Sequence, residues 1–126
     1  MATANVDRYD VYVTFDEERN VQLNGEGLSA DHVLHVRNGV AVILFRLGVE
    51  DAQVVFPSYP IVWTKAGVPV SPFASFQVYR VSDKLCAVID YNFEEVVRTY
   101  GFSVLVSDGG TIKSGDPTII NEPPGG

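Results

Sequence analysis

The sequence predicts an all-β fold, an antiparallel β-sandwich, with an Ig-like Greek key as one arrangement of its strands. Runs that alternate apolar and polar residues recur at spacings of roughly eight to twelve residues, with turn residues between them. Long amphipathic helices, linkers and internal repeats are missing from the pattern. The length of 126 residues, 46% of them hydrophobic, suits one domain with one core. We therefore expect a single domain over 1–126, with 117–126 as its C-terminal strand and tail.

The first half of the chain contains four predicted strands. Tyr9, Val11, Val13 and Phe15 alternate with polar or smaller residues, as a half-buried strand requires. A turn over 16–20 then leads to a short return strand. Asn38-Gly39 is the strongest hairpin signal in the chain and predicts that its two flanking strands pair. The predicted strands of this half are 9–15, 21–23, 32–37 and 40–46.

The second half continues the period of two. Short strands bounded by Pro57 and Pro60 come first, and 65–72 reads as a loop or a sheet edge because of its glycine and prolines. One segment, 92–100, breaks the alternation, and either a short helix capped by Asn92 or a wide loop fits it. The predicted strands of this half are 53–56, 61–64, 73–81, 84–91, 101–108 and 117–121, and after a turn at Asp108-Gly109-Gly110 residues 111–113 lead into Ser114-Gly115.

Composition excludes several classes of protein. The net charge of −7 makes binding to nucleic acid or to an anionic membrane unfavourable. Met1 to Asp7 does not have the pattern of a signal peptide, and Arg46 interrupts the longest apolar run. Cys86 lies within an apolar run and reads as a buried hydrophobic residue. We expect a cytoplasmic protein in a reducing compartment.

Common catalytic and metal-binding motifs do not occur, so the sequence predicts no cofactor and no metal site. Trp63, Tyr59 and Phe56 allow a carbohydrate-binding platform, although a core tryptophan is the more common role in a sandwich. An open sandwich also exposes edge strands, which favour a homodimer formed by sheet extension.

The last eleven residues contain the only Asp-Pro bond of the chain, Asp116-Pro117, and its only Glu-Pro bond, Glu122-Pro123. The Asp116 carboxyl group can reach its own carbonyl carbon and close a five-membered ring. The leaving nitrogen belongs to a tertiary amide, which takes up a proton more readily than a secondary amide. A folded site that orients this carboxyl group can weaken the bond further. A purely structural role, with Asp116 in a turn and Pro117 at the start of a strand, is the competing interpretation.

The segment Gly115 to Pro124, with both dipeptides, resembles the end of the DP-EP family of small bacterial proteins. The chain length and the strand Tyr100 to Val106 are also similar to that family. The resemblance implies a β-sandwich that cuts itself at Asp116-Pro117, like an aspartic peptidase acting within one molecule. It implies that the fragment 117–126 stays bound as a strand. It also implies a basic residue beside the scissile aspartate, where the family has a lysine and this chain has Arg98.

Two routes for the cut are open at this point. In one, the Asp116 carboxylate attacks its own carbonyl and water opens the cyclic anhydride. In the other, Asp116 activates the attacking water. Either route needs a proton for the proline nitrogen. The Asp116 carboxyl group itself is one candidate acid, although Arg98 beside it would favour the charged carboxylate. Tyr100 and Glu95 are candidates for a second donor. The substrate is then the chain itself. The alternative function is a non-enzymatic β-sandwich module that binds a protein or glycan through an exposed aromatic patch.

Overall fold

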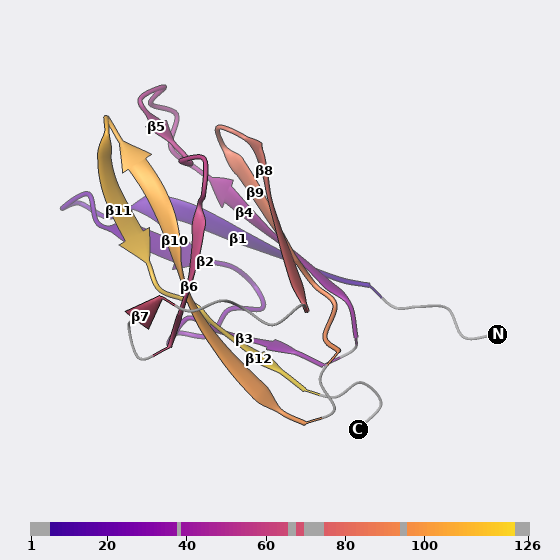
Figure 1. The fold of residues 1–126 in the computed structure, drawn as a ribbon. Coiled ribbons are helices and arrows are strands. Elements are labelled where there is room, and N and C mark those ends of the chain that lie inside the picture. The colour runs from indigo at the N-terminus through magenta and orange to yellow at the C-terminus, as the bar shows by residue number, and fades with distance from the viewer. Residues whose placement is uncertain (1–5, 38, 66–67, 70–74, 94–95, 123–126) are drawn as a thin grey trace.

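The computed structural model describes residues 6–37, 39–65, 68–69, 75–93 and 96–122, and it arranges them in twelve strands in two packed sheets (Figure 1). No helix occurs among these residues. The prediction of an all-β sandwich is therefore confirmed. Within the same ranges, nothing has the helical length and apolarity needed to cross a bilayer.

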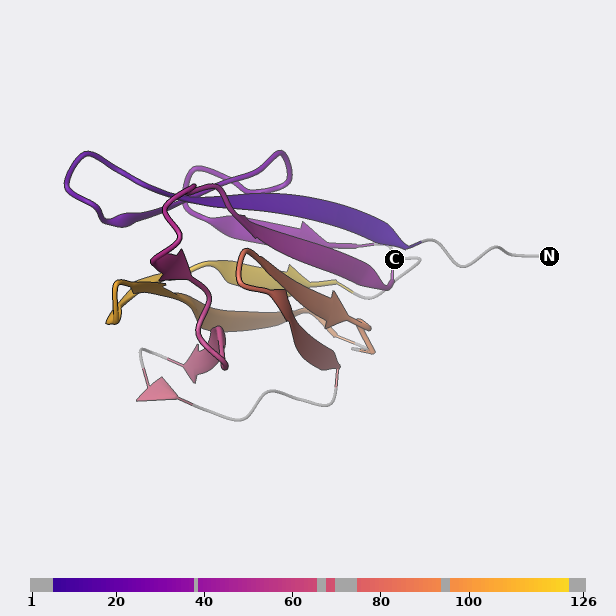
Figure 2. The ribbon, with the colours of Figure 1, turned by 90° about the horizontal axis from the view of Figure 1, so that it is seen from above.

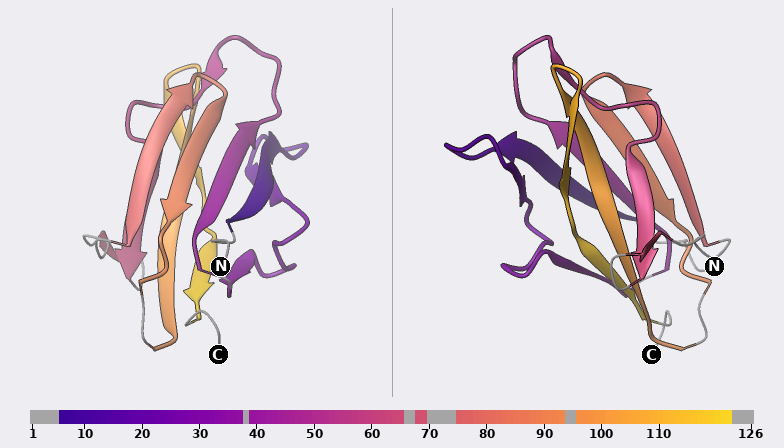
Figure 3. Two further views of the ribbon diagram at one scale, coloured as in Figure 1. Left: turned by 90° about the vertical axis from the view of Figure 1, so that its right-hand side faces the viewer. Right: turned by 60° about the vertical axis from the view of Figure 1, so that its left-hand side comes forward.

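The first sheet has five strands in the order β2-β1-β4-β9-β8. Its edge strand β8 lies beside β9, and β9 in turn lies beside β4, in the left view of Figure 3. The strands are β1 (Asp7–Phe15), β2 (Val21–Asn24), β4 (Ala41–Leu47), β8 (Phe76–Ser82) and β9 (Leu85–Asp90).

The second sheet has the order β3-β12-β10-β6-β7, and β5 and β11 also pair with the long strand β10. Seen from above, β1 lies over the gold strands of this sheet, which gives the two layers of the sandwich (Figure 2). The strands are β3 (Val33–Val36), β5 (Val54–Val55), β6 (Ile61–Lys65), β7 (Val68–Pro69), β10 (Arg98–Asp108), β11 (Thr111–Gly115) and β12 (Thr118–Asn121).

The prediction of purely antiparallel sheets is wrong at two places. β1 pairs with β4 in parallel, and β12 pairs with β3 in parallel. The hairpin predicted at Asn38-Gly39 is also wrong, because β3 and β4 belong to different sheets. Gly39 has a φ of 90° and lies in the connection that carries the chain between layers, whereas Asn38 lies outside the described residues. Alternation of side chains fixes the face of a strand but not its partner.

The described residues of the irregular segment after β9, Asn92, Phe93, Val96 and Val97, are not helical, and Glu94 and Glu95 lie outside the described residues. Asn92 has a φ of 48°, a left-handed conformation that asparagine adopts more readily than most residues. β10 begins at Arg98, so residues 98–100 of the predicted irregular segment belong to a strand.

The core lies between the sheets and contains the inward half of each alternating strand. Trp63 is only 8% exposed, and its ring centroid lies 4.4 Å from that of Phe76 and 5.2 Å from that of Phe102. Tyr59 is 85% exposed, so the two aromatic side chains do not form one platform. Cys86 is fully buried, and burial raises the pKa of its thiol to about 12, which confirms its structural role.

Candidate functional site

Asp116 and Pro117 lie in an extended segment that joins β11 to β12. β11 pairs with β10 up to Gly115 opposite Val104, and β12 resumes with Thr118 opposite Gly101. The register is the same on both sides, so Asp116 stands opposite Ser103 and Pro117 opposite Phe102. The Phe102 N–H donates to the Pro117 carbonyl oxygen at 3.3 Å. This hydrogen bond holds the predicted scissile bond beside β10, in the two-residue interval between β11 and β12.

The Asp116 carboxyl group faces the outer side of this sheet. It is exposed, and the Ser103 hydroxyl donates a hydrogen bond of 2.7 Å to its Oδ1 atom. A bond of this length between a hydroxyl and a carboxylate fixes the orientation of the carboxyl group. No salt bridge of Asp116 is found within the described part of the chain.

Pro117, in contrast, is buried. Successive side chains of a strand point to opposite faces, so the predicted bond joins an outward acid to an inward proline. Gly115 precedes them without a turn. A Cβ atom at Gly115 would lie 3.0 Å from Cγ1 of Val21 and 3.2 Å from side-chain atoms of Leu23. Glycine therefore lets this strand pass close to β2.

Arg98 does not lie beside Asp116. It is the first residue of β10 and stands opposite Asn121, five residues from Ser103. At about 3.3 Å of rise per residue that separation is about 16 Å along the strand, beyond the reach of an arginine side chain. Its position along the strand also has the parity of the inward residues, whereas Ser103 has the outward parity.

Tyr100 points into the core and contacts other aromatic rings. Its ring centroid lies 4.7 Å from that of Phe76 and 6.3 Å from that of Trp63, and only 8% of the residue is exposed. The sheet thus separates the Tyr100 ring from the outward Asp116 carboxyl group. Glu95 lies outside the described residues. Of the five predicted site residues, the structure joins only Asp116 and Pro117.

Ser103 is the neighbour that the sequence analysis missed. Its place between the apolar residues Phe102 and Val104 already indicates an outward side chain. Its pairing with Asp116 depends on the register of β10 with β11 and β12, which the sequence does not state directly. Pairing the predicted strand 101–108 with residues 111–113 through the turn at Asp108-Gly109-Gly110, and extending that register, would have found it.

Charged groups fasten the β10–β11 hairpin ahead of the predicted scissile bond. Arg19 donates two hydrogen bonds to Asp108, at 2.8 and 3.1 Å, and Lys113 lies 3.0 Å from the same carboxyl group. The hydrogen bonds from Arg19 and Lys113 lower the pKa of Asp108 to about 2. These cations also lie over the Phe15 ring, Arg19 at 5.0 Å and Lys113 at 5.1 Å from its centroid. The tip of the β1–β2 hairpin is thereby tied to the strand that leads to Asp116.

A second polar cluster lies at the far end of β12, inside the protein. Asp90, Asn92 and Asn121 are at most 3% exposed. Oδ1 of Asp90 accepts hydrogen bonds of 2.9 Å from the Asn92 N–H and from Nδ2 of Asn121. Nδ2 of Asn92 donates to the Glu122 carbonyl oxygen at 2.8 Å. This cluster, termed the buried Asp90 cluster below, connects the end of β9 to the end of β12.

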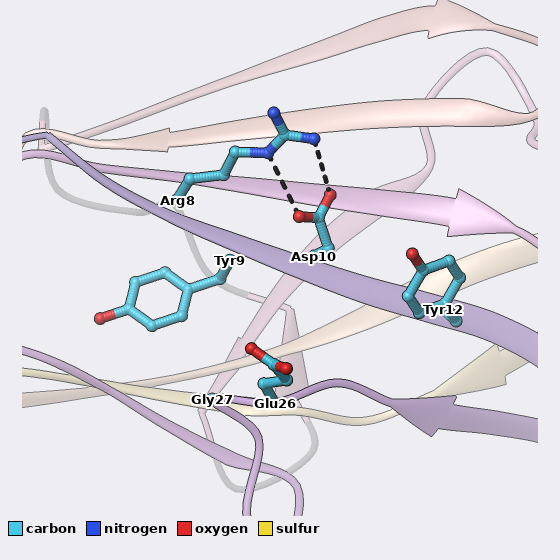
Figure 4. A pocket seen from close by; sticks show the side chains of 6 residues that line it. All are labelled: Arg8, Tyr9, Asp10, Tyr12, Glu26 and Gly27. Atoms are coloured by element: carbon cyan, nitrogen blue, oxygen red, sulfur yellow. Dashed lines mark hydrogen bonds and ion pairs between the residues drawn. The ribbon is translucent and has the colours of Figure 1, made fainter.

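A polar pocket of about 540 Å³ lies at β1, away from Asp116 (Figure 4). Arg8 donates two hydrogen bonds of 3.2 Å to Asp10, and Nε of Arg46 donates another of 3.0 Å. The bonds from Arg8, and then those from Arg46, lower the pKa of Asp10. The residues that line this pocket are Arg8, Tyr9, Asp10, Tyr12, Glu26 and Gly27.

Among the described residues, no group of three or more His, Cys, Asp or Glu side chains has the arrangement of a metal site. No protein-family model and no curated protein matches this chain. The membership in the DP-EP family therefore stays a prediction from the C-terminal dipeptides.

Proposed function

We propose that this protein cleaves its own Asp116-Pro117 bond and keeps the fragment 117–126 bound as a strand. The observation that carries the proposal is the 2.7 Å hydrogen bond from Ser103 to the Asp116 carboxyl group, next to an amide held against β10. The hydroxyl reduces the orientations open to the carboxylate, and fewer orientations increase its effective concentration at the neighbouring carbonyl carbon.

In the proposed reaction, a carboxylate oxygen of Asp116 attacks its own carbonyl carbon. The bond from this carbon to the Pro117 nitrogen breaks, and the nitrogen takes a proton from solvent. The product is a five-membered cyclic anhydride, which water opens to give a free α-carboxyl and a free side-chain carboxyl group. One water molecule is consumed overall. Asp116 is exposed, so water and protons reach the bond without a channel.

Contacts on both sides of β12 account for retention of the fragment. Thr118 donates its N–H to the His32 carbonyl at 2.8 Å, and Glu122 donates to the Val36 carbonyl at 2.9 Å. β10 pairs with the other side of β12 from Thr118 to Asn121. The cut falls before these contacts, so none of them has to break.

Intact-mass spectrometry under denaturing conditions tests the proposal on purified protein incubated at pH 5 and at pH 7. We expect two masses, for residues 1–116 and 117–126, and a faster split at pH 5 because the leaving nitrogen needs a proton. Asp116→Ala abolishes the split, since it removes the attacking group. Asp31→Ala is the matched control, because Asp31 is an exposed aspartate outside the site.

A single uncleaved mass for the parent protein after long incubation at both pH values would refute self-cleavage. The alternative, a binding module with an intact tail, would then account better for the protein. A cut that persists in Asp116→Ala would refute the role of the carboxyl group while leaving the bond itself as the site.

A further inference from the structure

β12 fills a cleft between two strands of its own sheet. β10 flanks it in antiparallel orientation and β3 in parallel orientation, and the pairing runs from Thr118 to Asn121 on both sides. β3 and β12 lie side by side near the C-terminus in Figure 1. A strand that is paired on both sides obtains its affinity from main-chain hydrogen bonds and its specificity from alternate side chains.

Two side chains of β12, Ile119 and Asn121, are buried inside the protein and contact it there. Ile119 is 1% exposed and joins the core, where it stands opposite Tyr100. Asn121 is fully buried and donates its side-chain N–H to the Asp90 carboxylate at 2.9 Å. A buried carboxylate that receives an amide N–H discriminates strongly against a side chain that lacks this donor. The cleft is therefore selective for isoleucine and asparagine at these two positions.

Further contacts fix where the strand ends. The Glu122 carbonyl accepts the hydrogen bond from Asn92, and the Glu122 carboxylate forms an ion pair with Arg37. Asn92 and Arg37 both precede the proposed cut, so residues 1–116 offer these two contacts to a strand from any copy of the chain. The buried Asp90 cluster thus binds the C-terminal end of β12. This end lies about five residues beyond the proposed cut, and each residue of a strand adds about 3.3 Å.

We infer that the cleft between β3 and β10 is a peptide-binding site for an extended strand of the form Pro-Thr-Ile-Ile-Asn-Glu, and that its occupant is exchanged between copies of this chain. The exchange rests on the proposed self-cleavage. While the chain is intact, the tether gives the strand an effective concentration of the order of mM. After the cut the strand is a separate ligand, which another copy's C-terminal fragment replaces by mass action, in the manner of donor-strand complementation.

The test starts from the full chain split at its single Asp-Pro bond, either by the protein itself or by warm dilute acid. Acid cuts this bond whether or not the native fold does, and the split material is refolded with a tenfold excess of synthetic peptide 117–126 labelled with heavy isotopes. Native mass spectrometry then measures which peptide each copy of 1–116 carries. We expect the ratio of heavy to light peptide bound to 1–116 to equal the ratio of the two peptides in the mixture.

Two variant peptides make the test specific. Asn121→Asp removes the donor to Asp90 and places two carboxyl groups together, and we expect its occupancy to fall at least tenfold. Ile120→Val changes an outward side chain of the same strand, and we expect occupancy within twofold of the natural peptide.

No uptake of the heavy peptide, failure to refold in its presence, or equal uptake of the Asn121→Asp peptide would overturn the inference. Failure of self-cleavage is seen separately, as an intact mass before any acid is added. A protein that does not cut itself but takes up the heavy peptide after acid cleavage retains the strand site and loses only the natural route to exchange.

Discussion

The two ends of the last strand hold acidic side chains in opposite ways. At its start, Asp116 is exposed on the outer face and receives one hydrogen bond, from Ser103. Near its end, Asp90 is fully buried and receives hydrogen bonds from Asn92 and Asn121. The comparison separates two uses of a carboxylate. A group that is to react with its own backbone needs access to water and a restricted orientation, whereas a group that anchors a strand needs burial and several donors.

Lengthening the acidic side chain at position 116 should have the largest effect on the rate of cleavage. Asp116→Glu keeps the charge but changes the ring of the cyclic anhydride from five to six members and moves the attacking oxygen. We expect cleavage to slow by about 100-fold, because effective concentration depends steeply on the position of the attacking atom. Time courses by intact mass measure it. If Asp116 instead activates a water molecule, the glutamate variant cuts at nearly the natural rate.

Removing the acid at the buried end affects stability rather than chemistry. Asp90→Ala takes the acceptor away from the Asn92 N–H and the Asn121 side chain, and we expect a loss of about 3 kcal/mol in the free energy of unfolding. Urea titration in the uncleavable Asp116→Ala background measures it. The exposed Asp31→Ala is the control and should stay within about 0.5 kcal/mol. A loss equal to that of the control would contradict the anchoring role of the cluster.

Removing the hydroxyl next to Asp116 tests the contact on which the proposed function depends. Ser103→Ala leaves the bond and its acid in place but frees the carboxyl group, so we expect cleavage to slow by about tenfold, or about 1.4 kcal/mol in the barrier. Ser107→Ala, on the same outward side of β10, serves as the control and should cleave at the natural rate. Equal rates for both variants would show that the orientation of Asp116 does not depend on Ser103.

Asp108 gives a third arrangement, a partly buried carboxylate paired with two cations, and its effect is the smallest. Its pKa in the folded protein is about 2, below the ordinary value of 3.8, because Arg19 and Lys113 bind the charged form. Its contribution to stability is therefore complete above pH 4 and is lost as the pH falls through 2. In the Asp116→Ala background, Asp108→Asn should remove part of the pH dependence of the urea midpoint between pH 4 and pH 2. An unchanged slope would contradict the pairing.

The sequence predicted the faces of the strands well and their partners poorly. Phe102, Val104 and Val106 alternate with Ser103, Leu105 and Ser107, and the first three all point into the core as predicted. The same kind of pattern surrounds Asn38-Gly39, yet the chain crosses there to the other sheet. Alternation depends only on neighbouring residues, whereas strand pairing depends on which distant strand offers a matching edge. The Ig-like variant of the sandwich and dimerisation through sheet edges stay predictions.

Strand register also explains which candidate site residues were predicted wrongly from the sequence. The resemblance to a known family pointed to Arg98, which the register of β10 places at the wrong end of the strand. Tyr100 was a candidate proton donor by its position in the sequence, but its parity turns it into the core. The buried Asp90 cluster joins residues 31 positions apart, and no local pattern marks such a pair.

What the sequence by itself determined is the chemistry of one bond: an aspartate next to a proline has its nucleophile and its leaving group within one dipeptide, and this needs no fold. The tertiary structure alone decided which groups surround that dipeptide. It fixed the register of the β10–β11 hairpin that brings Ser103 to Asp116. It also brought Asp90 to Asn121, because contacts across a sheet depend on the register of strands that are distant along the chain.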